Sequence, residues 1–89
     1  MRAAQRLESA RERLAALSPG GSPHRAIDVT SAAVIEVRAA VMTCPHCGGL
    51  YRILEHTRPV PDVRRVDVAC RQCSTPRALW FRIVEREPN

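Results

Sequence analysis

Hydrophobic positions follow a helical period at the start of the chain and alternate further on. The first apolar stripe recurs at steps of four and three residues, at Ala3, Leu7, Ala10, Leu14 and Leu17. This spacing places the stripe on one side of a helix, and the run Ser18-Pro19-Gly20-Gly21 ends it. The sequence therefore predicts an N-terminal amphipathic helix over residues 1–17, followed by a linker over residues 18–32 that contains glycine and proline.

An isolated helix of this length is marginally stable in water, so it needs a surface to lie on. Three leucines of the stripe are the candidate docking residues, at Leu7, Leu14 and Leu17. One hypothesis is that they pack on their own domain and cover Trp80. The other is that they dock on a partner, including a second copy of the chain in a homodimer.

Alternating patterns in the rest of the chain predict strands. Residues 33–43 are predicted to form a strand, although their alanine content would permit a helix: β-branched side chains and the alternation Glu36-Val37-Arg38 favour the strand. One face of it would carry Ala33, Ile35, Val37, Ala39 and Val41. Further strands are predicted over 50–56, 63–69 and 78–85, with a loop over 57–62 and a short extended piece over 27–29. In the last strand Leu79, Phe81 and Ile83 share one face, and Trp80 and Arg82 share the other. The domain they form is predicted to span residues 33–87.

All four cysteines of the chain lie in two CxxC pairs, Cys44–Cys47 and Cys70–Cys73, with 22 residues between them. A CxxC loop directs two thiolates at one point, and a hairpin of this length can bring two such loops together. The spacing predicts one tetrahedral Cys₄ site. Zinc is the expected ion, and iron is the alternative because four thiolates suit both metals.

The order of these elements is similar to that of the zinc-ribbon family: CxxC, strand, loop, strand, CxxC, strand. Two runs carry the resemblance, Thr43-Cys44-Pro45-His46-Cys47-Gly48-Gly49 and Ala69-Cys70-Arg71-Gln72-Cys73-Ser74. It implies a small α+β fold in which an antiparallel sheet of three to four strands holds one structural zinc ion. Ser74 stands where the family commonly has glycine, so we expect this second turn to be shaped differently. His46 is expected to be an exposed turn residue, because its side chain normally points away from the metal.

Length and composition agree with a metal-stabilised fold. The chain has 89 residues and only three aromatic side chains, Tyr51, Trp80 and Phe81. A core this small is marginal, and a structural zinc ion can contribute roughly 10–16 kcal/mol of apparent folding free energy. All fourteen basic residues are arginine, and the formal net charge is +5. Zn²⁺ bound to four thiolates would lower that charge by about two, which leaves a mildly basic protein.

Arginines near the only tryptophan form the candidate binding surface. Arginine beside tryptophan can stack a base and neutralise phosphates, so the first functional hypothesis is a nucleic-acid-associated accessory factor of the transcription or translation type. The second is a protein–protein adaptor that docks on a larger assembly through the N-terminal helix or the sheet face. The candidate residues are Arg52, Arg65, Arg71, Arg77, Trp80 and Arg82.

A catalytic role is a third hypothesis. Cys44-Pro45-His46-Cys47 is a tetrapeptide found in thiol oxidoreductases, but Gly48-Gly49 would break the helix that follows the motif in those enzymes. A closed Cys₄ sphere also leaves no position for a reacting water. We therefore expect a non-enzymatic module. Neither a secretory signal nor an apolar run long enough to span a membrane is visible, so the expected location is the reducing cytoplasm.

Overall fold

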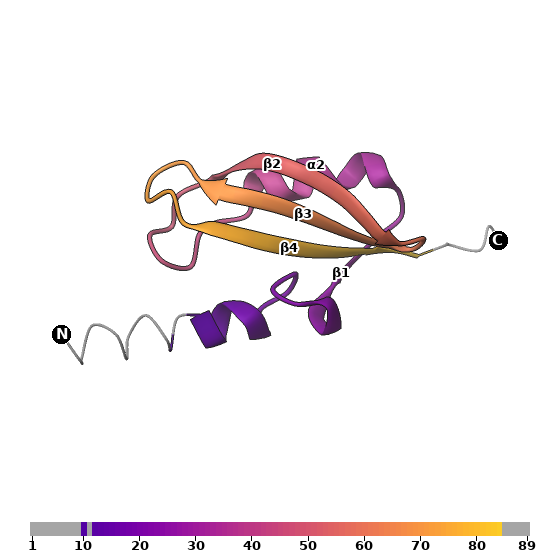
Figure 1. Ribbon diagram of the computed structural model, residues 1–89, viewed down its shortest axis with the longest axis horizontal. Helices are drawn as coiled ribbons and strands as arrows, with labels where there is room; N and C mark the ends of the chain where they lie inside the picture. Colours follow the sequence, from indigo (N-terminus) through magenta and orange to yellow (C-terminus); the bar gives the residue numbers. More distant parts are fainter. Residues whose placement is uncertain (1–9, 11, 85–89) are drawn as a thin grey trace.

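The computed structural model describes residue 10 and residues 12–84. Residues 12–17 are helical. The elements that follow are shown in Figure 1: a 3₁₀ turn η1 (Pro23–Arg25), β1 (Ile27–Val29), α2 (Ala32–Val41), β2 (Tyr51–Val60), β3 (Val63–Cys70) and β4 (Pro76–Ile83). Among the described residues, no helix has the length and apolar character needed to cross a bilayer. Leu7 and residues 85–87 of the predicted domain lie outside this description.

The four strands form one mixed sheet in the order β1-β4-β3-β2. The pairs β2–β3 and β3–β4 are antiparallel, as the sequence predicted. β1 is the short piece expected over 27–29, and it pairs parallel to β4, with Ile27 opposite Phe81 and Val29 opposite Ile83. The predicted small α+β class is therefore confirmed, whereas the sheet is mixed rather than wholly antiparallel.

The prediction of a strand over residues 33–43 was wrong, because this segment forms α2. Ile35 and Ala39 are buried, while Val37 and Val41 are 66% and 67% exposed. A set of apolar residues spaced by two also contains pairs spaced by four, which lie on one face of a helix. Both patterns therefore fitted the segment. Alanine-rich composition and the tertiary contacts of Ile35 select the helix.

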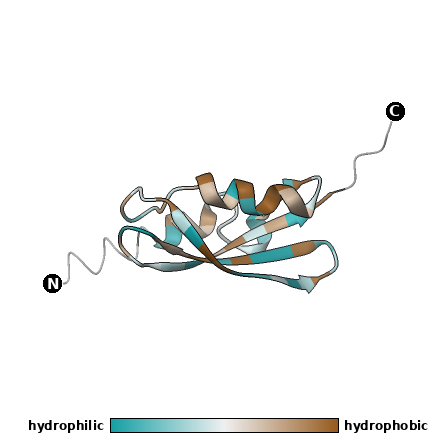
Figure 2. Cartoon of the chain, turned by 90° about the horizontal axis from the view of Figure 1, so that it is seen from above, coloured by the Kyte–Doolittle hydropathy of each residue, from teal (hydrophilic) through white to brown (hydrophobic). Residues whose placement is uncertain are grey.

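α2 covers one face of the sheet, which we call the core face. Figure 2 shows the helix along one side of the strands. Val66 and Val68 of β3 and Leu79 and Phe81 of β4 point toward it and are at most 2% exposed. The predicted alternation of β4 is confirmed, since Trp80 is half-buried and Arg82 is exposed on the opposite face. We call that opposite face the outer face.

β2 extends further than the sequence predicted. The segment 57–62 was expected to be a loop, but β2 continues to Val60 and only Pro61 and Asp62 form the turn. Register shifts interrupt the β2–β3 pairing between Ile53 and Glu55 and between Thr57 and Val60. Pro59 lies within the second shift on an edge strand, where a missing backbone N–H is tolerated. The proline therefore did not end the strand.

The described part of the N-terminal helical segment packs through Ala15 rather than through Leu14 and Leu17. Ala15 is 4% exposed, whereas Leu14 and Leu17 are 65% and 61% exposed. A Cβ atom placed on Gly21 would lie 1.8 Å from the Ala15 carbonyl oxygen, so the helix end sits directly on the backbone of the linker. Leu14 and Leu17 are thus not buried against Trp80, and both side chains face solvent.

Candidate metal centre

The four cysteine sulfurs lie together at one end of the sheet. The Sγ–Sγ distance is 3.7 Å between Cys44 and Cys73 and 3.3 Å between Cys47 and Cys70. All four sulfurs lie within 4.8 Å of one another. Sulfurs about 2.3 Å from a tetrahedral zinc ion are separated by about 3.8 Å, so the donor set has the dimensions of a four-thiolate site. The four cysteines are therefore positioned to hold a metal ion.

The first CxxC loop is a tight turn closed by backbone hydrogen bonds. The Cys44 N–H donates to the Gly49 carbonyl at 2.8 Å, and the Gly48 N–H donates to the Cys44 carbonyl at 2.7 Å. Thr43 and Leu50 form a bridge below it. Gly48 has a φ of 77°, a left-handed conformation that glycine adopts without steric cost. Cys44 and Cys47 are thereby directed at one point.

The second CxxC loop repeats this arrangement. The Cys70 N–H donates to the Thr75 carbonyl at 3.0 Å, and the Ser74 N–H donates to the Cys70 carbonyl at 3.0 Å. Ser74 has a φ of 63°, close to that of Gly48. The expectation that serine would give a differently shaped turn was wrong. The two carbonyl bonds impose the left-handed conformation on Ser74 despite its Cβ atom.

Backbone amides and one hydroxyl surround the sulfurs. The Gly49 N–H donates to Cys47 Sγ, and the N–H groups of Gln72 and Cys73 donate to Cys70 Sγ, each at 3.4 Å. The Thr75 hydroxyl lies 3.1 Å from Cys73 Sγ. Such donors stabilise thiolates and orient them for a metal.

The cysteine thiols of the cluster differ in pKa. Hydrogen bonds from the Thr75 hydroxyl and backbone lower the pKa of Cys73 to about 6. The Gly49 N–H favours the Cys47 thiolate, but the neighbouring Cys70 sulfur and burial outweigh it and raise the pKa of Cys47 to about 12. The pKa values of these two neighbouring thiols are therefore shifted in opposite directions. A divalent cation removes this difference, because it favours four thiolates at once.

His46 is not the exposed turn residue that the sequence predicted. Its side chain is 18% exposed, and Nε2 lies 2.6 Å from Glu12 Oε1. The same carboxylate lies 3.0 Å from Nη2 of Arg77, whose side chain is 11% exposed. Glu12 lies outside the apolar stripe of the N-terminal helix and is itself exposed. Glu12 lies three residues before the buried Ala15 and therefore on the same side of the helix. This spacing is the sequence feature that could have predicted its contact with the domain.

The structure separates the predicted arginine–tryptophan surface into three places. Arg52, Arg65, Trp80 and Arg82 lie on the outer face, by the pairing of Arg52 with Ala69, Arg65 with Trp80 and Arg82 with Val63. Arg71 is exposed at the second CxxC loop, where its Nε lies 3.4 Å from the Tyr51 carbonyl. Arg77 lies on the core face and pairs with Glu12.

Arg65 and Trp80 contact each other across neighbouring strands. The Arg65 guanidinium carbon lies 5.6 Å from the centre of the Trp80 ring. Its Nε donates to Asp67 Oδ1 at 3.0 Å, so the guanidinium is held between a ring and a carboxylate. This cation–π contact leaves Trp80 half-buried on the outer face.

Comparison of the chain with models of protein families, with curated proteins and with solved structures finds no match. The class assigned to the molecule therefore depends on its own geometry: a small α+β domain with a four-cysteine cluster positioned for a metal ion.

Proposed function

We propose that the chain is a non-enzymatic binding module of the zinc-ribbon type, with one structural zinc ion, that binds nucleic acid through the outer face of its sheet. The order of CxxC loop, β2, β3, CxxC loop and β4 agrees with that family. Four thiolates complete a tetrahedral sphere, which suits a structural ion and leaves no open position for catalysis. Zinc is preferred over iron in this proposal, and the reducing cytoplasm is the compartment in which the thiols stay available.

The observation that carries the nucleic-acid proposal is the position of Trp80 beside Arg65 on the outer face. Within the described part of the chain, α2 packs on the core face and Leu14 and Leu17 are exposed, so neither α2 nor these leucines cover the ring, while the Trp80 backbone N–H donates to the Gly20 carbonyl at 2.8 Å. Arg52 and Arg82 are exposed on the same face and provide further positive charge. An aromatic ring flanked by arginines offers base stacking together with phosphate neutralisation, which is how many single-strand binding surfaces work.

Fluorescence anisotropy with a labelled single-stranded oligonucleotide tests this proposal across a range of salt concentrations. Affinity is expected to fall steeply with salt, and Arg82→Ala is expected to reduce the slope of log K against log[salt] by about 0.7. Trp80→Ala is expected to weaken binding by roughly tenfold through lost stacking. Arg38→Ala is the matched control, because it removes the same charge from exposed α2 on the other side of the sheet. Binding that ignores salt, or equal effects of Arg82→Ala and Arg38→Ala, would rule the proposal out.

One observation favours the adaptor as a second candidate function. Val34, Val37 and Val41 of α2 are 37%, 66% and 67% exposed, and their spacing places them on one stripe. With Leu14 and Leu17 of the N-terminal segment, they give the domain apolar helical surface available to a larger assembly. Val37→Asp would abolish capture of such a partner and leave oligonucleotide binding unchanged, which distinguishes the two functions.

A further inference from the structure

Glu12 is held by two side chains that lie far from it in the sequence. Its Oε1 lies 2.6 Å from His46 Nε2 and 3.0 Å from Arg77 Nη2, and Oε2 lies 3.5 Å from Arg77 Nη1. His46 belongs to the first CxxC loop and Arg77 to β4. A carboxylate is thus bound by a guanidinium fork and an imidazole, which together recognise planar or tetrahedral oxyanions.

Arg77 is positioned more rigidly than a surface arginine. Its side chain is 11% exposed and lies beside Tyr51, whose pKa is raised to about 12 mainly by burial. The Arg77 Nε is buried and has no hydrogen-bond partner within the described residues. The guanidinium therefore binds Glu12 with its two Nη nitrogens, the edge that recognises an oxyanion with two acceptor oxygens.

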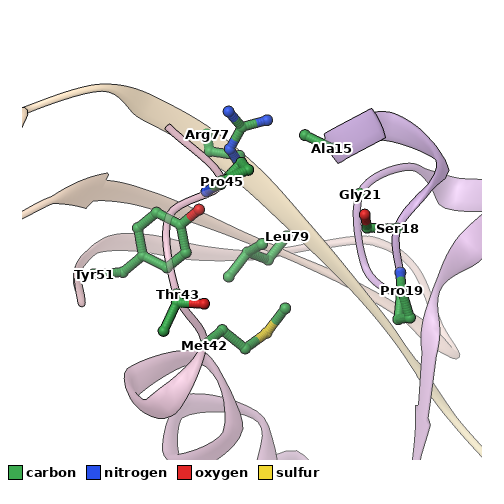
Figure 3. Close-up of a pocket in the computed structure, with 10 residues that line it drawn as sticks. All are labelled: Ala15, Ser18, Pro19, Gly21, Met42, Thr43, Pro45, Tyr51, Arg77 and Leu79. Carbon is green, nitrogen blue, oxygen red and sulfur yellow. The ribbon is translucent and has the colours of Figure 1, made fainter. Parts of the chain in front are cut away.

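The helical segment that carries Glu12 buries one of its described side chains against the domain. Of its described helical residues only Ala15 is buried, and Glu12, Leu14 and Leu17 are exposed. A cavity of about 90 Å³ lies between this segment and the domain. Figure 3 shows Ala15, Ser18 and Gly21 on one side of it, and Tyr51, Leu79 and Arg77 on the other.

We propose that His46 and Arg77 form a binding site for a phosphate group, and that Glu12 occupies this site as an intramolecular competitor. A phosphate can replace the Glu12 carboxylate and accept from His46 Nε2 and from both Nη groups of Arg77, and at neutral pH it carries more negative charge than a carboxylate. The site lies beside the metal centre and on the opposite side of β4 from Trp80. It is therefore separate from the outer face used by the proposed function.

Titration of inorganic phosphate into ¹⁵N-labelled, metal-loaded protein, followed by NMR, tests the site. Glu12→Gln is expected to bind phosphate about tenfold more tightly than the unchanged chain, because the competing charge is removed. The Arg77 Nε–Hε and His46 ring resonances should shift most. Equal affinities of the two proteins, or shifts confined to other residues, would overturn the proposal.

Glu36→Gln is the matched control. Glu36 is an exposed carboxylate that also lies near a histidine, with its Oε2 3.8 Å from His56 Nδ1. Its removal changes the net charge by the same amount without opening Arg77. If Glu36→Gln tightens phosphate binding as much as Glu12→Gln, general electrostatics explains the effect and the site is refuted.

A second arm distinguishes the source of the phosphate. If the group belongs to a polynucleotide backbone, Glu12→Gln will also bind a single-stranded oligonucleotide more tightly and with a steeper salt dependence, by about 0.7 in log–log slope. If only inorganic phosphate gains affinity, the site takes a free phosphate or a small phosphate ester. Because Trp80→Ala acts only on the outer face, loss of oligonucleotide binding in that variant reports on the proposed function and not on this site.

Discussion

Ser74 in the second CxxC loop has the same left-handed backbone conformation as Gly48 in the first, with φ angles of 63° and 77°. Each follows the second cysteine of its loop, and each donates its N–H to the carbonyl of the first cysteine. The two loops are therefore equivalent in backbone although they differ in sequence. Glycine adopts this conformation without penalty, whereas serine does so at a steric cost.

Ser74→Gly is expected to stabilise the metal-loaded protein by about 0.5–1 kcal/mol, and Gly48→Ala to destabilise it by about 1 kcal/mol. In the part of the chain that the structure describes, no heavy atom apart from the glycine and its two chain neighbours lies within 4 Å of a Cβ built on Gly48, so the second effect is conformational. Chemical denaturation of the two variants measures both values. Ser22→Gly is the control, because Ser22 has an extended φ of −153° and gains nothing from glycine. Stabilisation by Ser22→Gly as large as that by Ser74→Gly would contradict the explanation.

Gly49→Ala is expected to lower metal affinity by about tenfold or more. The cause is a steric clash of the added methyl group, not an unfavourable backbone conformation. A Cβ atom at Gly49 would lie 2.9 Å from the Gln72 Cβ and 3.0 Å from the Cys70 Sγ. The two loops would have to move apart, and displaced groups around a metal commonly reduce affinity by this amount. Competition with a chromophoric chelator measures the affinity. Gly48→Ala is the internal comparison, since it costs stability without disturbing any sulfur.

Removal of the metal is expected to unfold the domain. Among residues 12–84 the main core cluster is small, with ten buried residues, and two of these are Cys44 and Cys70. A strong chelator should therefore abolish the sheet signal in circular dichroism, and zinc should restore it. Native mass spectrometry should find one zinc ion per chain. A folded, metal-free monomer would show that the cysteine cluster is not required for folding.

Metal affinity is expected to fall as the pH is lowered, and to fall more steeply below about pH 6. Binding requires thiolates, so each sulfur protonated at the working pH must release a proton. Cys47 has a pKa of about 12, so it releases a proton on metal binding throughout the neutral pH range. Cys73 has a pKa of about 6, so it releases a proton on metal binding only near or below pH 6. Thr75→Val removes the hydroxyl beside Cys73, raises the pKa of that thiol, and should move the steep region to higher pH. Calorimetry in buffers of different ionisation enthalpy counts the protons released.

Ile35→Ala and Val37→Ala distinguish the helix α2 from the strand that the alternating pattern favoured. In a strand the two residues share a face, so the two substitutions would have similar effects. In α2, Ile35 is 0% exposed and Val37 is 66% exposed. We expect a loss of about 2–4 kcal/mol for Ile35→Ala and a change within about 0.5 kcal/mol for Val37→Ala. Equal losses from thermal or chemical denaturation would contradict the helix.

Sequence patterns over a few neighbouring residues correctly predicted the features that depend only on those residues. The alternation of Leu79, Trp80 and Phe81 identified β4 and its two faces, and the CxxC spacing identified the four sulfurs that the structure brings together. The pattern over 33–43 failed because apolar residues at every second position satisfy a helix and a strand equally. The choice between them depended on which surface Ile35 meets.

Contacts between distant residues were not predictable in this way. Glu12 reaches His46 across 34 positions and Arg77 across 65, and no spacing rule connects residues so far apart. The parallel pairing of Ile27 with Phe81 likewise follows from how the linker folds back on β4.

The sequence by itself determined the two CxxC loops and the side chains that each strand presents on its two faces, because cysteine chemistry and the strand period act over a few residues. Only the tertiary structure decided that Ser74 adopts the backbone of Gly48, that α2 is a helix, and that Glu12 lies on Arg77. Each of these depends on what packs against the segment: a carbonyl of the same loop, the core face of the sheet, or a guanidinium on β4.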